Sequence, residues 1–130
     1  MEEKIQKTEM LYRAIKRSKP DWLDYNGKPT ASMYKDEGGN SVDRDDNRTI
    51  EEVVYFMENG IFKNRLKGVI EISAGSCMDI GAIVVPDPKD YNPYHANIFI
   101  DEDIVKGNLQ ALRLADASKV VFLNGEMNWV

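Results

Sequence analysis

The sequence predicts an α+β fold, in which a single domain has a mixed, mostly antiparallel sheet of about five strands and two helices on one face. Three observations support this prediction. Short β-branched runs bounded by glycine, such as residues 67–74, are typical of strands. Residues 50–59 repeat apolar side chains at helical spacing. The chain of 130 residues has the length of one domain (1–130), and its 42% hydrophobic content suffices for one packed core.

The first third of the chain is predicted to hold one strand and one long loop. Residues 1–8 are polar, and we expect them to be frayed. Residues 10–15 fit both helical and strand spacing, and because Pro20 soon stops the run we favour a strand. Residues 20–48 are rich in glycine, proline, asparagine and aspartate and have almost no apolar periodicity. We therefore expect a long ordered loop there.

The clearest local signal is the capping box Thr49-Ile50-Glu51-Glu52, which predicts the start of an amphipathic helix. Asn59-Gly60 predicts its end. After this helix, β-branched runs predict strands over residues 67–74, 82–85 and 95–100. The first two strands are joined by a turn over 75–81 with room for one helical turn. The proline-rich residues 86–93 predict a stiff connection to the third strand.

A second helix is predicted after the acidic residues 101–103, which suit the positive end of a helix dipole. Its expected buried stripe is Val105, Leu109, Leu112 and Ala115. Gly107 is expected to weaken this helix by about 1 kcal/mol relative to alanine. Residues 119–123 then form a strand, and Asn124-Gly125 predicts a hairpin turn whose returning arm is 126–130.

Composition and charge indicate the cellular compartment and the class of partner. The chain has one cysteine, Cys77, no apolar run near the ~18 residues of a membrane span and a polar N-terminus, which together predict a cytoplasmic protein without a membrane partner. The net charge is -5, and residues 68–130 contain 4 Lys or Arg against 9 Asp or Glu. This acidic second half makes a nucleic-acid partner unlikely and favours a protein partner with a basic surface.

The only histidine, His95, is the default candidate for a general acid or base, because its ordinary pKa lies near neutrality. A lone histidine on a strand is nevertheless more often structural. Asn97 follows two residues later and would share its face. Asp43 is the second candidate catalytic group. The expected ligand-binding residues are Arg13, Ser41, Arg44 and Asn97, with the two arginines suited to phosphate.

No metal site is predicted. One histidine and one cysteine leave too few ligands for zinc, and the acidic run 43–47 fails the calcium-loop template at Arg48 and Val54. The glycines match no phosphate-binding loop. Cys77 and His95 remain a possible thiol–imidazole pair, although a lone cysteine is more often a buried core residue.

Arg13 on an early strand, followed by a strand that contains Ser41, is similar to the arrangement in ADP-ribosyltransferase-like folds, which bind NAD. No glutamate of this chain can be matched to that family's motif. The resemblance therefore implies a nucleotide-type ligand and assigns no catalytic residue.

Two functions are expected from different classes. The first is a small cytosolic binding or accessory protein that acts on a protein partner through its acidic surface and long loop, without a cofactor. The alternative is an enzyme acting on a nucleotide or another phosphorylated substrate, with an NAD-like compound as one candidate, Arg13 and Arg44 on phosphate and His95 as acid or base. The sequence leaves the oligomeric state open.

Overall fold

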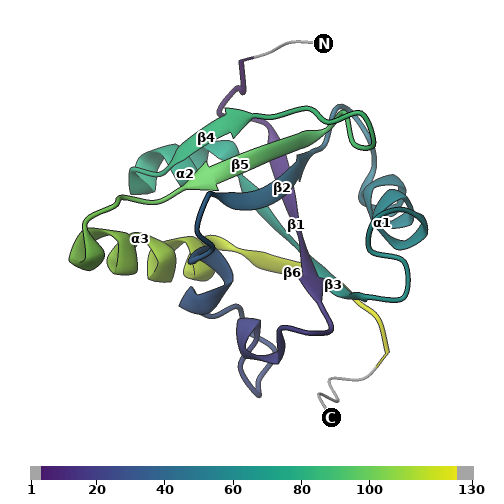
Figure 1. The fold of residues 1–130 in the computed structure, drawn as a ribbon, viewed down its shortest axis with the longest axis horizontal. Helices are drawn as coiled ribbons and strands as arrows, with labels where there is room; N and C mark the ends of the chain where they lie inside the picture. The colour runs from purple at the N-terminus through teal and green to yellow at the C-terminus, as the bar shows by residue number, and fades with distance from the viewer. Residues whose placement is uncertain (1–3, 126–130) are drawn as a thin grey trace.

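The computed structural model describes residues 4–125, which form one six-stranded sheet with helices on both faces (Figure 1). The strand order is β4-β5-β2-β1-β3-β6, and each neighbouring pair is antiparallel. The predicted α+β class is confirmed, with six antiparallel strands in place of a mixed sheet of about five. The strands are β1 (Met10–Lys16), β2 (Asn40–Arg44), β3 (Leu66–Ser73), β4 (Ile83–Pro86), β5 (His95–Phe99) and β6 (Lys119–Leu123).

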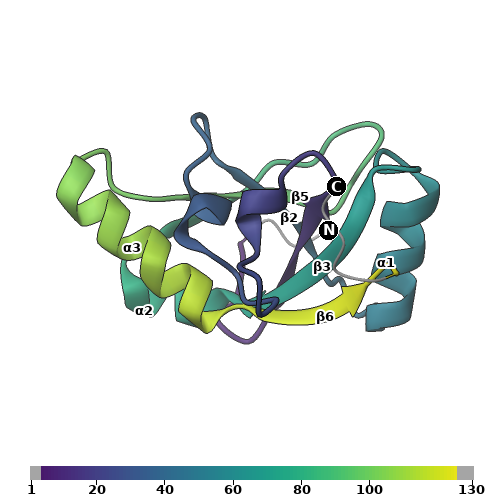
Figure 2. The same cartoon turned by 90° about the horizontal axis from the view of Figure 1, so that it is seen from below.

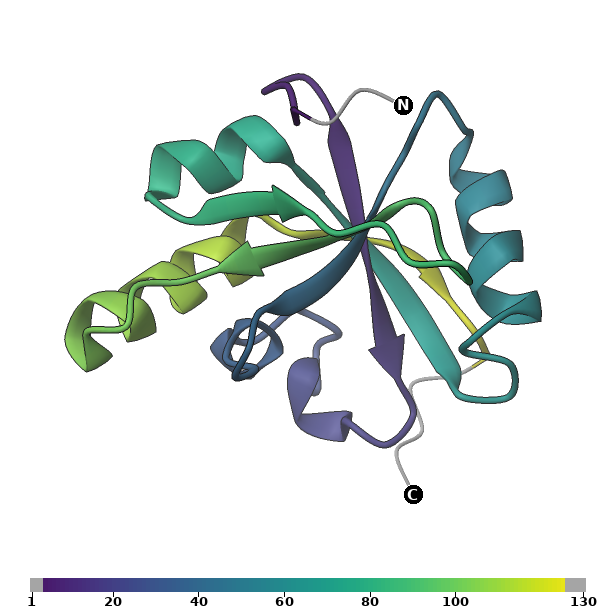
Figure 3. The ribbon, with the colours of Figure 1, turned by 45° about the horizontal axis from the view of Figure 1, so that its top comes forward.

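The helices lie on opposite faces of the sheet, whereas the sequence predicted two helices on one face. α1 packs against Tyr12 and Ala14 of β1, and the other helical elements pack against Leu11 and Ile15 of the same strand. Since successive strand residues point to opposite sides, the apolar residues of β1 need cover on both faces. Figures 2 and 3 show α1 at one end of the molecule and α2 with α3 at the other. The helical elements are η1 (Pro20–Trp22), η2 (Ala31–Tyr34), α1 (Ile50–Asn59), α2 (Ala74–Ile80) and α3 (Ile104–Ala117), η denoting short 3-10 helices.

The capping box predicted for α1 is present. The Thr49 hydroxyl accepts from the Glu52 amide at 3.1 Å, and the Glu52 carboxylate accepts from the Thr49 amide at 2.9 Å. α1 buries Val53, Val54 and Met57 against β1 and β3. On this face the β2, β5 and β4 half of the sheet is left uncovered, so that Ser41 is exposed and Ile83 of β4 is 64% exposed.

The segment predicted as a loop over 20–48 is shorter and more structured than expected. It contains η1 and η2, and it ends where β2 begins at Asn40. Its aromatic residues Trp22 and Tyr34 are buried in the core on the α2 and α3 face. Residues 4–8 are also attached to the fold, because Ile5 is buried and the Lys7 carbonyl accepts from the Gly75 amide at 2.9 Å. Long-range apolar contacts therefore order both segments.

The turn predicted over 75–81 is the helix α2, capped by the Ser73 hydroxyl and ended by Gly81 at φ 98°. α3 was predicted in place, but of its predicted buried stripe only Ala115 is buried. Val105 is 77% exposed, and Leu109 and Leu112 are exposed as well. The buried face consists of Gly107, Ala111, Leu114 and Ala115. Three of these four residues are small, and α3 lies against η2, whose Tyr34 hydroxyl bonds the Ser118 hydroxyl at 2.7 Å.

The strand predicted at 119–123 is β6, at one edge of the sheet. The hairpin arm predicted over 126–130 lies outside the described residues. Within residues 4–125, no helix has the length and apolar character needed to cross a bilayer.

Gly107 tests the packing of α3. A methyl group added there would overlap the carbonyl oxygen of Asp101. Alanine at this position is therefore expected to destabilise the protein, which is the reverse of the expectation from helix propensity. We expect Gly107→Ala to lower the free energy of unfolding by about 1–3 kcal/mol, as overpacking does. Urea denaturation measures this, with exposed Asn108→Ala as a control expected within about 0.5 kcal/mol of wild type. A more stable Gly107→Ala protein would contradict the close approach.

Candidate functional site

A cleft of about 240 Å³ opens beside α1, where β1 and β2 separate. The two strands pair only at Leu11 with Arg44 and at Tyr12 with Asp43. Beyond Tyr12, β1 continues along β3 while β2 continues along β5. The space between the diverging strands becomes the cleft, and Met57 of α1 with the turn after α1 forms one wall.

A row of polar side chains crosses the sheet at the edge of this cleft. The strand registers place Glu71, Tyr12, Asp43 and His95 opposite one another on β3, β1, β2 and β5. All four point to the α1 face, because residues directly opposite in a sheet share a face. The Tyr12 hydroxyl donates to a Glu71 carboxylate oxygen at 2.7 Å, and burial raises the pKa of Tyr12 well above its usual value. Tyr12, Asp43 and His95 line the cleft.

Asp43 is a buried carboxylate, only 5% exposed. Its Oδ1 accepts from the Asn92 side-chain amide at 2.8 Å. Burial raises the pKa of Asp43 above its ordinary value, although the Asn92 bond and the charge of Arg48 partly oppose this shift. Within residues 4–125, no hydrogen bond reaches the second carboxylate oxygen, Oδ2, which is not fully enclosed. Asp43 thus presents an available acceptor to the cleft.

His95 is held by the segment that follows β4. Its Nδ1 lies 2.9 Å from the Asp87 carbonyl oxygen and 3.3 Å from the Asp87 carboxylate. Because a carbonyl oxygen only accepts, Nδ1 carries the proton, and in neutral imidazole Nε2 is then the acceptor. No hydrogen bond from residues 4–125 reaches Nε2. The Asn97 side-chain amide also donates to the Asp87 carboxylate, at 3.2 Å, so it helps to hold Asp87 beside His95.

Arg13 lines the cleft, but its guanidinium is engaged in contacts with the protein. Nε donates to the Met33 carbonyl at 2.9 Å, and Nη1 donates to the Ser41 carbonyl at 2.8 Å. Nη2 pairs with Asp36 at 2.8 Å, and the group lies 4.4 Å from the Trp22 ring centre. Arg13 is therefore a structural bridge across the gap between β1 and β2.

The structure brings four of the six predicted residues to one cleft, namely Arg13, Ser41, Asp43 and His95. Arg44 is not among the lining residues. It points to the opposite face from Asp43, where it pairs with Glu9 at 2.7 Å. The two arginines are consequently not arranged as a joint phosphate clamp with His95. Cys77 packs in the core on the opposite face, which separates it from His95, and burial raises the pKa of its thiol to about 12.

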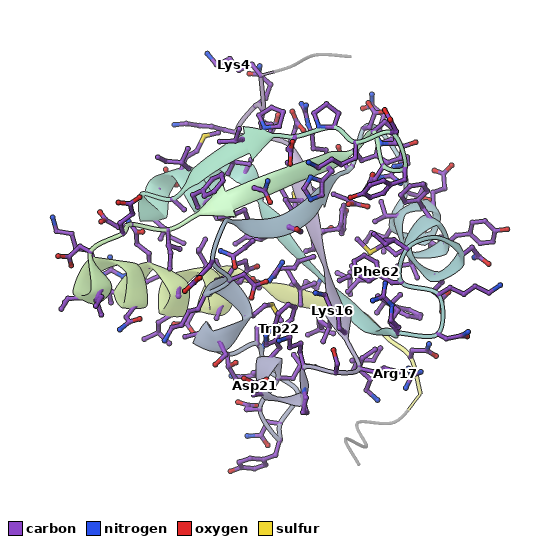
Figure 4. The ribbon with its side chains drawn as sticks, in the orientation of Figure 1. Lys4, Lys16, Arg17, Asp21, Trp22 and Phe62 are labelled. Carbon is purple, nitrogen blue, oxygen red and sulfur yellow. The ribbon has the colours of Figure 1, made fainter. Side chains whose placement is uncertain are left out.

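Sequence reasoning missed the residues that support the site. Asn92 and Asp87 belong to the connection 86–93, which was interpreted as a stiff linker. Its three prolines were a usable signal, since a rigid segment next to a lone histidine can fix the ring. The apolar wall could not be found from sequence, because Phe62 reaches the cleft only through the packing of α1 (Figure 4). Residues 4–125 contain no group of three or more histidine, cysteine or acidic residues placed to hold a metal.

Arg13→Lys tests the bridge between β1 and the segment before β2. Lysine cannot reproduce the three-way guanidinium contact, and the buried carbonyl acceptors would lose donors. We expect a loss of about 2–4 kcal/mol in the free energy of unfolding, measured by urea denaturation. The exposed neighbour Arg17→Lys is the control and should stay within about 0.5 kcal/mol. Equal stability of the two variants would show that the bridge is dispensable.

Asp43→Asn tests the cost of the buried carboxylate. Because folding raises the pKa of Asp43, the folded state binds its proton more readily, and wild type loses stability as pH rises from the unfolded-state pKa through the folded-state pKa. An amide keeps the Asn92 contact without this loss. We expect Asp43→Asn to melt above wild type at neutral pH, with the difference shrinking toward about pH 3.

Melting curves across this pH range measure the effect, and exposed Asp90→Asn serves as the control. A wild-type protein that is more stable than Asp43→Asn at neutral pH would mean that the carboxylate has a stabilising partner.

The comparison with known proteins gives no relative from which a role could be transferred. No protein-family model, no curated protein and no solved structure matches this chain. The chemistry of the site is therefore argued from its own residues.

Proposed function

We propose that this protein is a small cytoplasmic binding protein, without catalysis of its own, that holds a basic and partly apolar segment of a protein partner. The proposed binding surface is a groove of about 890 Å³ between residues 35–40 and the start of α3, called the acidic groove below. The single observation that carries the proposal is that the end of the long loop and the acidic stretch 101–103 border the same groove.

The acidic groove combines a charged rim with an apolar floor. Its rim contains five carboxylates and a single lysine, Lys35. One of the five, Asp36, is paired with Arg13, and the other four are exposed. The floor is formed by Ile83, Phe99, Ile100 and Ile104. The carboxylates are Asp36, Glu37, Asp101, Glu102 and Asp103.

Charge complementarity indicates the chemistry of the partner. Carboxylates around an apolar floor favour lysine or arginine side chains beside aliphatic ones, and opposite charges speed the encounter of two proteins. Ile104 at the start of α3 is 78% exposed and lies next to the acidic rim. Ile83, which lines the same groove, is 64% exposed, and two exposed isoleucines in one groove support an interaction surface rather than a purely solvated one.

Two further observations support a cytoplasmic protein without catalysis. Cys77 is a free thiol in the core, which suits a reducing compartment. Neither Arg13 nor Arg44 is free to bind phosphate, because Arg13 bridges three acceptors and Arg44 pairs with Glu9. The alternative, an enzyme for a nucleotide or another phosphorylated substrate, therefore has less support than the binding function.

The experiment is a binding titration with a labelled peptide of alternating lysine and leucine, followed by fluorescence anisotropy. We expect Glu37→Lys with Glu102→Lys to weaken binding roughly tenfold, because both carboxylates are exposed on the rim. The effect should shrink in high salt, which screens exposed charges.

The control changes the same net charge elsewhere. Asp90→Lys with Asp116→Lys replaces two exposed carboxylates outside the groove. It should bind the peptide within about threefold of wild type. If both double variants weaken binding equally, the peptide senses only total charge and the acidic groove is not the site. A glutamate–leucine peptide that binds as well as the basic one would also reject the proposal.

A further inference from the structure

The cleft beside α1 presents two hydrogen-bond acceptors without partners among residues 4–125. These are Asp43 Oδ2 and His95 Nε2. Both belong to buried or half-buried residues that neighbouring groups already hold in place, namely Asn92 for Asp43 and Asp87 for His95. Adjacent positions on β2 and β5 place the two acceptors on the same face. A group with two or three donors would satisfy both.

The cleft combines these polar groups with an apolar part. Met57 of α1, with Ile61 and Phe62 of the turn that follows, supplies apolar lining to the same cleft. Ala14 of β1 adds to the floor. At about 240 Å³, the cleft is smaller than pockets for drug-sized ligands, which start at about 300 Å³. Its occupant must therefore be a small molecule with an apolar body.

We propose that this cleft binds a small organic compound that carries a primary ammonium group on an apolar body. The ammonium donates to Asp43 Oδ2 and His95 Nε2, and the body packs against Met57, Ile61 and Phe62. This site is independent of the acidic groove, which is lined by different residues except Asp36.

An ammonium suits the site better than a neutral or anionic group. A buried carboxylate without a cation hydrogen-bonded to it is costly, and an entering cation offsets that cost. Arg48 influences Asp43 through its charge, but its Nε and Nη2 donate to the carbonyls of Asp45 and Arg44. Arg13 is already balanced by Asp36. An anion would instead face the Asp43 carboxylate.

The remaining cations of the cleft lie at its other end. Lys16 is four residues beyond Tyr12 on β1, about 13 Å at the usual strand rise. Arg65 lies nearby, since its carbonyl accepts from the Arg17 amide at 2.8 Å. Lys16 and Phe62, both labelled in Figure 4, are among the residues that line the cleft. These charges are too distant to compete with the ammonium for the Asp43 carboxylate, and they would tolerate an anionic substituent at the far end of the ligand.

The experiment follows backbone amide signals by NMR while 2-phenylethylamine is added at neutral pH. The neutral and anionic probes of similar shape are 2-phenylethanol and 3-phenylpropionate. We expect saturable shifts at Tyr12, Asp43 and His95 with the amine below about 10 mM, as suits a fragment of this size. The alcohol should bind roughly tenfold more weakly, and the carboxylate should cause no saturable shift.

Asp43→Asn separates binding from folding, because we expect it to be at least as stable as wild type while binding the amine roughly tenfold more weakly. His95→Phe keeps a flat ring without the acceptor and should weaken binding as well. Asp79→Asn, an exposed carboxylate on α2, is the matched control and should bind like wild type. Equal affinity for amine and alcohol, unchanged binding by Asp43→Asn, or the lack of a saturable shift would each reject the proposal. None of these outcomes would count against peptide binding in the acidic groove, because that proposal is tested with a different ligand and different variants.

Discussion

The contact on which the rest of the structure depends is the guanidinium of Arg13. β1 and β2 stop pairing after Tyr12 and Asp43, and the Arg13 side chain takes the place of the missing ladder by donating to the Ser41 carbonyl. The same group binds the Met33 carbonyl and Asp36, which ties residues 33–36 to the sheet. One planar group with several donors can satisfy all three acceptors at once. The cleft lies in the same gap between β1 and β2 that the Arg13 side chain spans.

Neighbouring residues of one strand point to opposite faces of the sheet and therefore have different partners. Asp43 and Arg44 are adjacent in sequence, yet Asp43 points into the cleft and Arg44 pairs with Glu9 on the other face. α1 covers only one half of its face and leaves β2, β5 and β4 open. β5 therefore joins the two surfaces of interest, with His95 at the cleft and Phe99 at the acidic groove. One short strand thus carries residues of both the cleft and the acidic groove.

Buried polar groups distinguish this site from an ordinary core. Arg13 has partners on each of its guanidinium nitrogens, whereas Asp43 has one partnered oxygen and one that faces the cleft. Asp43 Oδ2 is not fully enclosed, and among residues 4–125 the buried side-chain polar atom without a hydrogen-bond partner is Arg48 Nη1. Retaining a carboxylate that folding disfavours is typical of a group kept for binding rather than for stability.

The sequence by itself determined the elements whose signals are local. The Thr49 capping box, the strands at 10–15 and 119–123 and the strand of His95 were predicted because a cap or an alternating pattern acts within a few residues. Tertiary structure alone decided which stripe of α3 is buried, that residues 74–80 form a helix, and that Arg13 and Arg44 are structural partners rather than free anion-binding groups. Each of these outcomes depends on groups far away in sequence, such as Met33 for Arg13 and Tyr34 for α3, and no local pattern encodes where such groups will lie.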